Sequence, residues 1–428
     1  MRATRTFRVE DPVKIKQALF GWSKSFDQVV WLDSNNHTDP YSTFEACLAV
    51  GKHKTFHGLE ELKKFTDLSP DWLFGYFSYD LKNEFEDLVS ENHDELGFQN
   101  LYFFQPLKLI VLKGDELHFL YLDEVSHEID LDFKTLYLNE LEVGFGIADE
   151  TPIKIKMRIH KDAYFEKASK FLEHIHRGDI YEANFCQEFF AEEVSIDPWD
   201  THTKLNAISE PPFSAFMRLD DRYLMCASPE RYLKKTGTKV ISQPIKGTAK
   251  RGQTPQEDEK LAENLAADEK ERAENIMIAD LVRNDLSKSA KKGSVTVEEL
   301  CKVYTYKQVH QMISTIVSEV DKDKSPLDLI AETFPMGSMT GAPKVSAMKI
   351  IEELEETKRG LYSGAVGYFG PNGDFDFNVV IRSILYNAKS KYISYSVGSA
   401  ITSRSIPENE YQECLLKAKA MRSVLEKS

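Results

Sequence analysis

Two pairs of carboxylates have a spacing that could hold a metal ion. Glu410 and Glu413 fall on one face of an expected C-terminal helix, and Lys417 follows four residues after Glu413. Glu271 and Glu274 lie three residues apart, where a charged helix becomes strongly apolar. Carboxylate oxygens suit a hard cation, but an i, i+4 ion pair on a solvated face is the commoner cause of such a pattern. Both interpretations stay open on spacing alone.

An acid and a nucleophile could meet at one end of a predicted hairpin. Glu230 lies in CASPERY and Lys246 in ISQPIKGT, and each follows a strand-like run beside a proline. If the two runs pair through the turn KKTGTK, both side chains fall near the same sheet end. A carboxyl group there could protonate a leaving group, and an amine could attack a carbon atom. A lysine in a surface turn is the alternative.

The elements that must position these residues are strands with interleaved helices. Short apolar runs between turn signals fill the N-terminal third, where KGDE marks one hairpin. Helices are expected at 161–177, 255–290 and 407–425, and the last two begin with a proline. Strands and helices alternate without a βαβ rhythm. We therefore predict an α+β fold in which large antiparallel sheets pack as a sandwich with helices outside.

Composition and charge exclude several classes of function. The chain has 54 Lys and Arg against 69 Asp and Glu, a net charge of −15, which argues against nucleic acid or a membrane surface as partner. Its apolar runs are far shorter than the roughly 18 residues of a membrane span, so we expect a cytoplasmic protein. The glycine-rich FPMGSMTGAPKV lacks P-loop spacing, which disfavours nucleotide binding. An anionic substrate would need locally placed Lys, Arg or a metal ion.

Five longer blocks, taken in order, resemble the chorismate-binding enzymes. They are PIKGT, RAENIMIADLVRNDL, FPMGSMTGAPKVSAMKIIEELE, RGLYSGAVGYFGPNGDFDFNVVIRS and ENEYQECLLKAKA. The family includes anthranilate synthase component I, aminodeoxychorismate synthase component I, isochorismate synthases and salicylate synthases. The resemblance is strong from about residue 165 and weaker before it. It implies a β-rich N-terminal region over 1–151, similar to an effector-binding region, packed intimately against a chorismate-binding catalytic region over 152–428.

The resemblance implies a magnesium (Mg2+) site. Glu274 and Glu413 match the family's metal carboxylates, and Glu410 and Glu271 match more distant or water-mediated partners. A metal ion held there would neutralise one carboxylate of chorismate, which explains how an acidic protein tolerates a dianionic substrate.

The resemblance also assigns the substrate contacts. Tyr362 and Arg382 match the pair that holds the second carboxylate, and Glu230 matches the general acid that protonates the departing 4-hydroxyl group. Further positions that match contacts to the substrate are Gly398, Lys417, Thr340 and Gln311.

Lys246 selects a branch of the family. Aminodeoxychorismate synthases resemble PIKGT, whereas anthranilate synthases usually read PIAGT. The resemblance therefore implies that chorismate and ammonia give 4-amino-4-deoxychorismate, the precursor of p-aminobenzoate and folate, after Lys246 attacks C2. Attack needs a neutral amine, so we expect a lowered pKa for this lysine. The alternatives are anthranilate synthase component I and a non-catalytic tryptophan-binding subunit, because VVWLDSN around Ser34 resembles the family's effector site.

Three positions depart from the family pattern. Glu182 stands where amine-using members usually have Gln, and Gln311 occupies what resembles the position of a catalytic histidine. Ala400 ends a GSA segment that replaces a glycine-rich turn. We expect Gln311 to donate a hydrogen bond to the substrate ring.

The cysteines indicate where the nitrogen comes from. None of the five belongs to a CxxC pair, so reduced, buried thiols are expected. A glutaminase needs an activated cysteine, usually in a Gly-x-Cys-x-Gly turn, and no cysteine here has glycine on both sides. We therefore expect ammonia to be delivered by a separate glutamine amidotransferase subunit.

Overall fold

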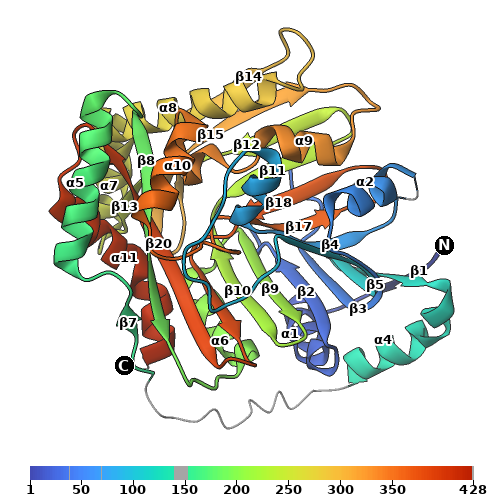
Figure 1. Cartoon of the computed structure of the whole chain (residues 1–428). Coiled ribbons are helices and arrows are strands. Elements are labelled where there is room, and N and C mark those ends of the chain that lie inside the picture. The colour runs from blue at the N-terminus through green and yellow to red at the C-terminus, as the bar shows by residue number, and fades with distance from the viewer. Residues whose placement is uncertain (38, 69, 139–152, 427–428) are drawn as a thin grey trace.

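Two antiparallel sheets share one long strand and pack face to face (Figure 1). The computed structural model describes residues 1–426 except 38, 69 and 139–152. The shared strand, β5 (Leu101–Lys113), pairs with β3 along one edge, while β4 and β6 divide the other edge between them. Because β4 and β6 both pair with this edge, the chain can split into two layers there.

The first sheet carries the longer series of strands. Its order is β1 (Arg2–Arg8), β6 (Glu116–Leu122), β5, β3 (Ala46–Phe56), β2 (Gln28–Asp33), β9 (Phe213–Leu219), β10 (Arg222–Ser228), β19 (Ser383–Asn387), β20 (Tyr392–Thr402) and β8 (Glu182–Ala191). Two short strands also pair with β8, namely β7 (Lys156–Met157) and β16 (Gly341–Ala342).

The second sheet starts from β5 and ends at β14. Its order is β4 (Leu73–Phe77), β17 (Ala365–Phe369), β18 (Phe375–Val379), β11 (Arg231–Thr236), β12 (Lys239–Gln243), β15 (Val309–Glu319) and β14 (Thr296–Thr305). Strand β13 (Ile245–Lys250) continues past β12 along the same edge of β15.

Alternation along the strands builds two cores. In β2, Val30 faces the core between the sheets, whereas Val29 and Trp31 face the core beneath the helices. The helices described are α1 (Pro12–Trp22), α2 (Leu59–Leu68), α3 (Lys82–Phe85), α4 (Ile129–Leu138), α5 (Lys161–Arg177), α6 (Pro198–Ser209), α7 (Pro255–Ala267), α8 (Glu269–Ser287), α9 (Pro326–Thr333), α10 (Lys344–Leu354) and α11 (Pro407–Glu426). This arrangement confirms the predicted α+β sandwich with helices outside.

The local predictions hold with one exception. The hairpins at KGDE and KKTGTK form as predicted, and helices α5 and α11 cover the expected residues. The single helix predicted over 255–290 is wrong, because the chain turns at Asp268 and begins a second helix there. The Asp268 carboxylate accepts the backbone N–H of Glu271 and so caps the N-terminus of α8.

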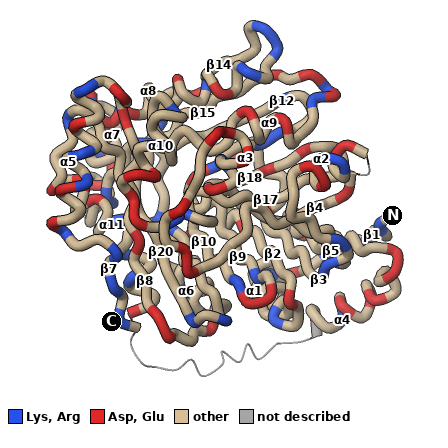
Figure 2. Tube along the Cα trace, in the orientation of Figure 1, with Lys and Arg blue, Asp and Glu red and all other residues tan. Residues whose placement is uncertain are grey.

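Strands from both predicted regions lie in the same sheets. Strand β2 pairs with β9, and β4 pairs with β17, so hydrogen-bonded ladders join the N-terminal strands to those of the longer region. The predicted boundary at 151/152 lies outside the described residues. Figure 2 shows Lys and Arg interspersed with Asp and Glu along the trace. Within the described part of the chain, no helix combines the length and apolar character needed to cross a membrane.

Candidate active site

A cavity of about 580 Å³ collects most of the predicted site residues. Seven Lys or Arg and five Glu line it, so basic residues outnumber acidic ones here although the whole chain carries −15. This local balance suits an anionic ligand that also contacts a cation. The predicted residues that line it are Glu230, Lys246, Glu271, Glu274, Gln311, Tyr362, Arg382, Gly398, Glu410, Glu413 and Lys417.

Glu230 is a buried carboxyl group at the turn between β10 and β11. Its side chain is 4% exposed, and Ser338 Oγ donates a hydrogen bond to its Oε1 at 2.6 Å. Burial raises the pKa of Glu230 to about 7, although the Ser338 hydroxyl and the charge of Lys246 partly oppose the shift. A carboxyl group with this pKa can hold a proton at neutral pH and deliver it to a leaving group. Sequence reasoning missed Ser338.

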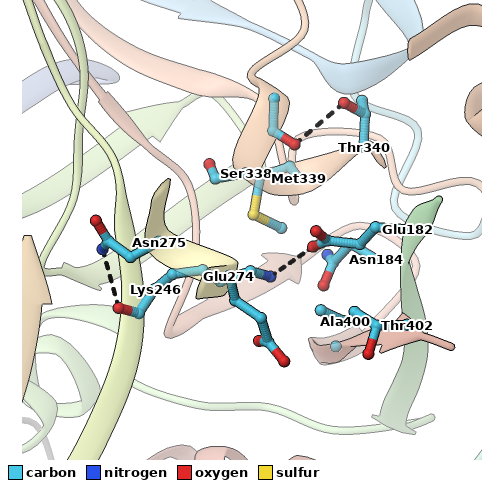
Figure 3. A network of polar contacts seen from close by, with 12 residues as sticks. Glu182, Asn184, Lys246, Glu274, Asn275, Ser338, Met339, Thr340, Ala400 and Thr402 are labelled. Carbon is cyan, nitrogen blue, oxygen red and sulfur yellow. Dashed lines mark hydrogen bonds and ion pairs between the residues drawn. The ribbon is translucent and has the colours of Figure 1, made fainter. Parts of the chain in front are cut away.

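Lys246 reaches into the site from the start of β13 and forms an ion pair (Figure 3). Its Nζ lies 3.0 Å from Glu182 Oε1, and Asn275 Nδ2 holds its backbone carbonyl at 3.0 Å. Burial lowers the pKa of Lys246, but the charges of Glu182, Glu274 and Glu413 outweigh burial and raise it above its ordinary value. The expected lowered pKa is therefore wrong for this state. The pattern RAEN contained Asn275, but only the fold shows its contact with β13.

Four glutamates from α8 and α11 supply the predicted metal oxygens. Burial raises the pKa of Glu274 to about 7. Burial also raises the pKa values of Glu271 and Glu410, and the negative charge of Glu413 adds to both of these shifts. Glu413 itself pairs with Lys417 at 2.6 Å, and this pairing overcomes burial and lowers its pKa. Among the described residues, no group of three or more His, Cys, Asp or Glu side chains is arranged to hold a metal ion. Carboxylate oxygens are the donors that magnesium prefers, so the type of these four side chains, rather than their arrangement, agrees with the predicted metal.

Arg382 is a basic group that has no carboxylate within ion-pair distance in the described part of the chain. It adopts a left-handed φ of 53°, and its Nη1 makes one hydrogen bond, at 3.5 Å to the carbonyl of Lys417. No acidic side chain of the described residues forms a salt bridge with it. Burial lowers the pKa of Arg382, which shows that its charge is poorly compensated. Tyr362 lines the same cavity, with its hydroxyl 3.7 Å from Cys186 Sγ. The guanidinium is therefore available to an anionic ligand.

The remaining cavity positions come from β20 and β15. The carbonyl of Gly398 accepts Lys417 Nζ at 2.8 Å, and a Cβ on this glycine would lie 2.6 Å from Cys186 Sγ. Ala400 also lines the cavity, but within strand β20 rather than in a turn. Gln311 is 3% exposed and its Oε1 has no hydrogen-bond partner among the described residues. The Nε2 amide group of the same side chain can still donate a hydrogen bond, so the predicted contact with the substrate ring stays a prediction.

Two predicted residues lie apart from this cavity. The hydroxyl of Thr340 donates to the backbone carbonyls of Met336 and Gly337, and Thr340 is not among the residues that line the cavity. Ser34 lines a different, much smaller cavity of about 60 Å³. Arg231 and Asp376 form a buried ion pair in the wall of that second cavity.

Comparison with known proteins identifies the family. A model described as chorismate binding enzyme matches residues 19–423. The chain is 33% identical over 399 residues to aminodeoxychorismate synthase component 1 of Bacillus subtilis, which covers 91% of this chain and 83% of that protein. It is also 33% identical over 373 residues to anthranilate synthase component 1 of Thermus thermophilus, covering 85% and 80% respectively. The crystal structure of anthranilate synthase component I from Streptococcus pneumoniae TIGR4 matches with a TM-score of 0.78 and 25% identity, covering 90% of this chain and 94% of that one. The chain belongs to the chorismate-binding enzyme family.

Proposed function

We propose that this enzyme converts chorismate and ammonia to 4-amino-4-deoxychorismate. The observation that carries the proposal is Lys246, which lines the cavity together with the buried acid Glu230 and the unpaired Arg382. An amine, a protonated carboxyl group and an anion-binding guanidinium are groups that suit a substitution at C4 of this dicarboxylate. The name of the Bacillus subtilis relative points to the same reaction.

Arg382 and Tyr362 hold one carboxylate of the substrate in this proposal. The guanidinium makes one long hydrogen bond to the described residues, at 3.5 Å, so a bound carboxylate would supply further partners. The planar fork of arginine fixes the orientation of the carboxylate as well as its position. Orientation matters because attack on the ring needs the reacting atoms aligned.

The chemistry proceeds in two substitutions. The Lys246 nitrogen forms a bond to C2 as the ring double bonds shift and the C4–O bond breaks, and Glu230 donates the proton that lets the oxygen leave as water. Ammonia then forms the C4–N bond as the double bonds shift back and the C2–N bond to the lysine breaks. Splitting one displacement into two is the ordinary advantage of covalent catalysis.

Glu274 and Glu413 would hold magnesium, with Glu271 and Glu410 beyond them. The raised pKa values of Glu274, Glu271 and Glu410 indicate unbalanced negative charge in a buried place, which a cation would offset. When bound, the metal would supply positive charge for the second carboxylate of the substrate. Lys417 pairs with Glu413 and lines the cavity, where its ammonium group would also be able to contact the substrate.

Nitrogen would reach the site as ammonia from a partner. All five cysteines are free and buried, and burial raises the pKa of each thiol. A glutaminase uses a reactive thiolate, which burial in apolar surroundings disfavours. A separate glutamine amidotransferase subunit is therefore part of the proposal.

Anthranilate synthesis is the second candidate. The specific observation that favours it is the Thermus thermophilus relative, which is as similar to this chain as the Bacillus subtilis one. The two reactions differ in the position aminated and in the fate of the pyruvyl group, so their products differ in mass and in fluorescence.

The test is Lys246→Ala, assayed with chorismate, magnesium and an ammonium salt, with products identified by mass spectrometry. We expect the wild-type enzyme to form aminodeoxychorismate and the variant to lose it, with kcat falling more than KM rises. Lys250→Ala is the matched control, because Lys250 lies on the same strand and lines the cavity. Wild-type production of anthranilate alone, or an unchanged variant, would refute the proposal.

A further inference from the structure

Glu182 is a buried carboxylate with one partner. It begins β8, its side chain is 2% exposed, and its Oε1 lies 3.0 Å from Lys246 Nζ. The other oxygen, Oε2, is buried and has no hydrogen-bond partner among the described residues. Figure 3 shows the Lys246 side chain extended toward this carboxylate. A buried carboxylate normally has its oxygens satisfied, so this exception needs an explanation.

Two other buried glutamates of this part of the fold show what a structural carboxylate has here. Glu188, on the same strand, accepts two hydrogen bonds from Arg158 and one from Tyr392. Glu355 accepts two from Arg359 and one from the backbone N–H of Cys186. Each therefore has three donors that stabilise its charge. Within the described part of the chain Glu182 contacts Lys246 alone, so moving one proton from Lys246 to Glu182 disturbs a single interaction.

The position of Lys246 demands a proton acceptor. Its Nζ forms an ion pair at 3.0 Å with the buried Glu182 carboxylate, which favours the ammonium form, yet attack on carbon requires the neutral amine. The charged groups that act on it are Glu182 from β8, Glu274 and Glu271 from α8, Glu413 from α11 and Glu230 from the turn before β11. Of these described groups, only Glu182 lies within ion-pair distance of Nζ. Glu230 cannot serve, because the reaction needs its proton for the leaving hydroxyl group.

We propose that Glu182 is the residue that accepts the proton of Lys246 at the start of the reaction and returns it at the end. This inference rests on the proposed function. The Nζ–H bond breaks and an O–H bond forms on Glu182 as the amine bonds to C2. When the C2–N bond breaks later, the released neutral lysine takes the same proton back. The net charge of the pair does not change in either transfer, which suits a buried site.

Glu182→Gln separates this role from simple positioning. A glutamine oxygen can still accept a hydrogen bond from Lys246, but an amide cannot take up a proton. The readout is formation of the covalent lysine adduct in a single turnover with chorismate and magnesium and without ammonium, measured by quenching and intact-protein mass. We expect a rate loss of about 10²- to 10⁴-fold. The residual rate should rise about tenfold per pH unit, because Lys246 must then lose its proton to solvent.

A second variant places a base elsewhere in the cavity. Gln311 lines the cavity on β15, and its neighbour in the adjacent strand is Thr248, two residues after Lys246. Histidine there could accept the proton. Adding Gln311→His to Glu182→Gln should therefore raise the rate of adduct formation at least about tenfold. The gain should exceed the one that Gln311→His gives in the wild-type background. Glu188→Gln is the control for loss of a buried carboxylate on β8.

The outcomes distinguish the two levels of the proposal. If the wild-type enzyme forms neither the adduct nor aminodeoxychorismate, the proposed function fails. If the wild-type enzyme forms both but Glu182→Gln reacts within about threefold of it, the function stands and the role of Glu182 is refuted. A loss with the same pH dependence as the wild-type enzyme, or no selective gain from Gln311→His, also refutes that role.

Discussion

Replacing Glu230 with glutamine should make the protein less active and, at alkaline pH, more stable. Burial raises the pKa of this group from its ordinary 4.5 to about 7. The folded protein therefore holds a proton that the unfolded chain has already lost between these two pH values. Stability is present in full below about pH 4.5 and falls as the pH rises toward 7, because the fold resists ionisation of the buried group.

The magnitude follows from the shift. At 1.36 kcal/mol per pKa unit, moving from 4.5 to about 7 corresponds to about 3 kcal/mol of unfolding free energy. Glutamine carries no charge at any pH and its oxygen can still accept the hydrogen bond from Ser338. The variant should therefore exceed the wild-type protein by less than about 1 kcal/mol near pH 5 and by about 3 kcal/mol near pH 8.5. Turnover should fall by about 10²- to 10⁴-fold, because glutamine cannot protonate the leaving group.

The assay is denaturant unfolding of both proteins near pH 5 and near pH 8.5, followed by single-turnover kinetics. Glu188→Gln is the control, because that glutamate accepts hydrogen bonds from Arg158 and Tyr392. Its replacement should lower the free energy of unfolding at both pH values. A stability difference between Glu230→Gln and the wild-type protein that is equal at both pH values would show that Glu230 is not protonated in the fold. Retained turnover would remove its role as the acid.

Three further results are expected. Glu413→Gln should weaken magnesium binding by about 10- to 100-fold in calorimetry, whereas Glu408→Gln, at an exposed site on the same helix, should leave it unchanged; equal affinity in both would refute the metal assignment. Arg382→Lys should raise KM for chorismate at least about tenfold, because an ammonium group cannot bind a carboxylate bidentately, and an unchanged KM would exclude that contact. The purified chain should form no product from glutamine without an ammonium salt, since its thiols are buried, and robust product formation would show that no partner is needed.

Local signals account for what the sequence predicted of the fold. Helix α5 ends at Gly178, which adopts the left-handed φ of 89° that glycine favours, and α7 and α11 begin with proline. The break between α7 and α8 had a signal as well. Asp268 followed three residues later by Glu271 has the spacing of a capping box, but the charged, helix-favouring residues on both sides concealed it.

Contacts between distant segments account for what the sequence did not predict of the site. Resemblance selected residues such as Glu230 and Lys246, but not what holds them. Ser338 reaches Glu230 across 108 residues of sequence, and the Asn275 side chain supports Lys246 across 29. Such pairs form only when sheets and helices are assembled, so no local pattern specifies them. The raised pKa of Lys246 was unpredictable for the same reason, since its cause lies on β8, α8 and α11.

These distant contacts also set the proton states of the site. Burial favours the protonated form of Glu230 against the opposing hydrogen bond from Ser338, and the proposed reaction uses that proton. Three carboxylates keep a proton on Lys246, where the proposed reaction must remove it. The two groups start protonated for opposite reasons, one because its charge is penalised and the other because its charge is compensated. A lower pH keeps both Glu230 and Lys246 protonated, and a higher pH favours deprotonation of both. A change of pH alone therefore cannot give a protonated Glu230 beside a neutral Lys246. A carboxylate that accepts the proton of Lys246 directly, without exchange with solvent, resolves this conflict. Glu182, 3.0 Å from Lys246 Nζ, is placed to be that acceptor.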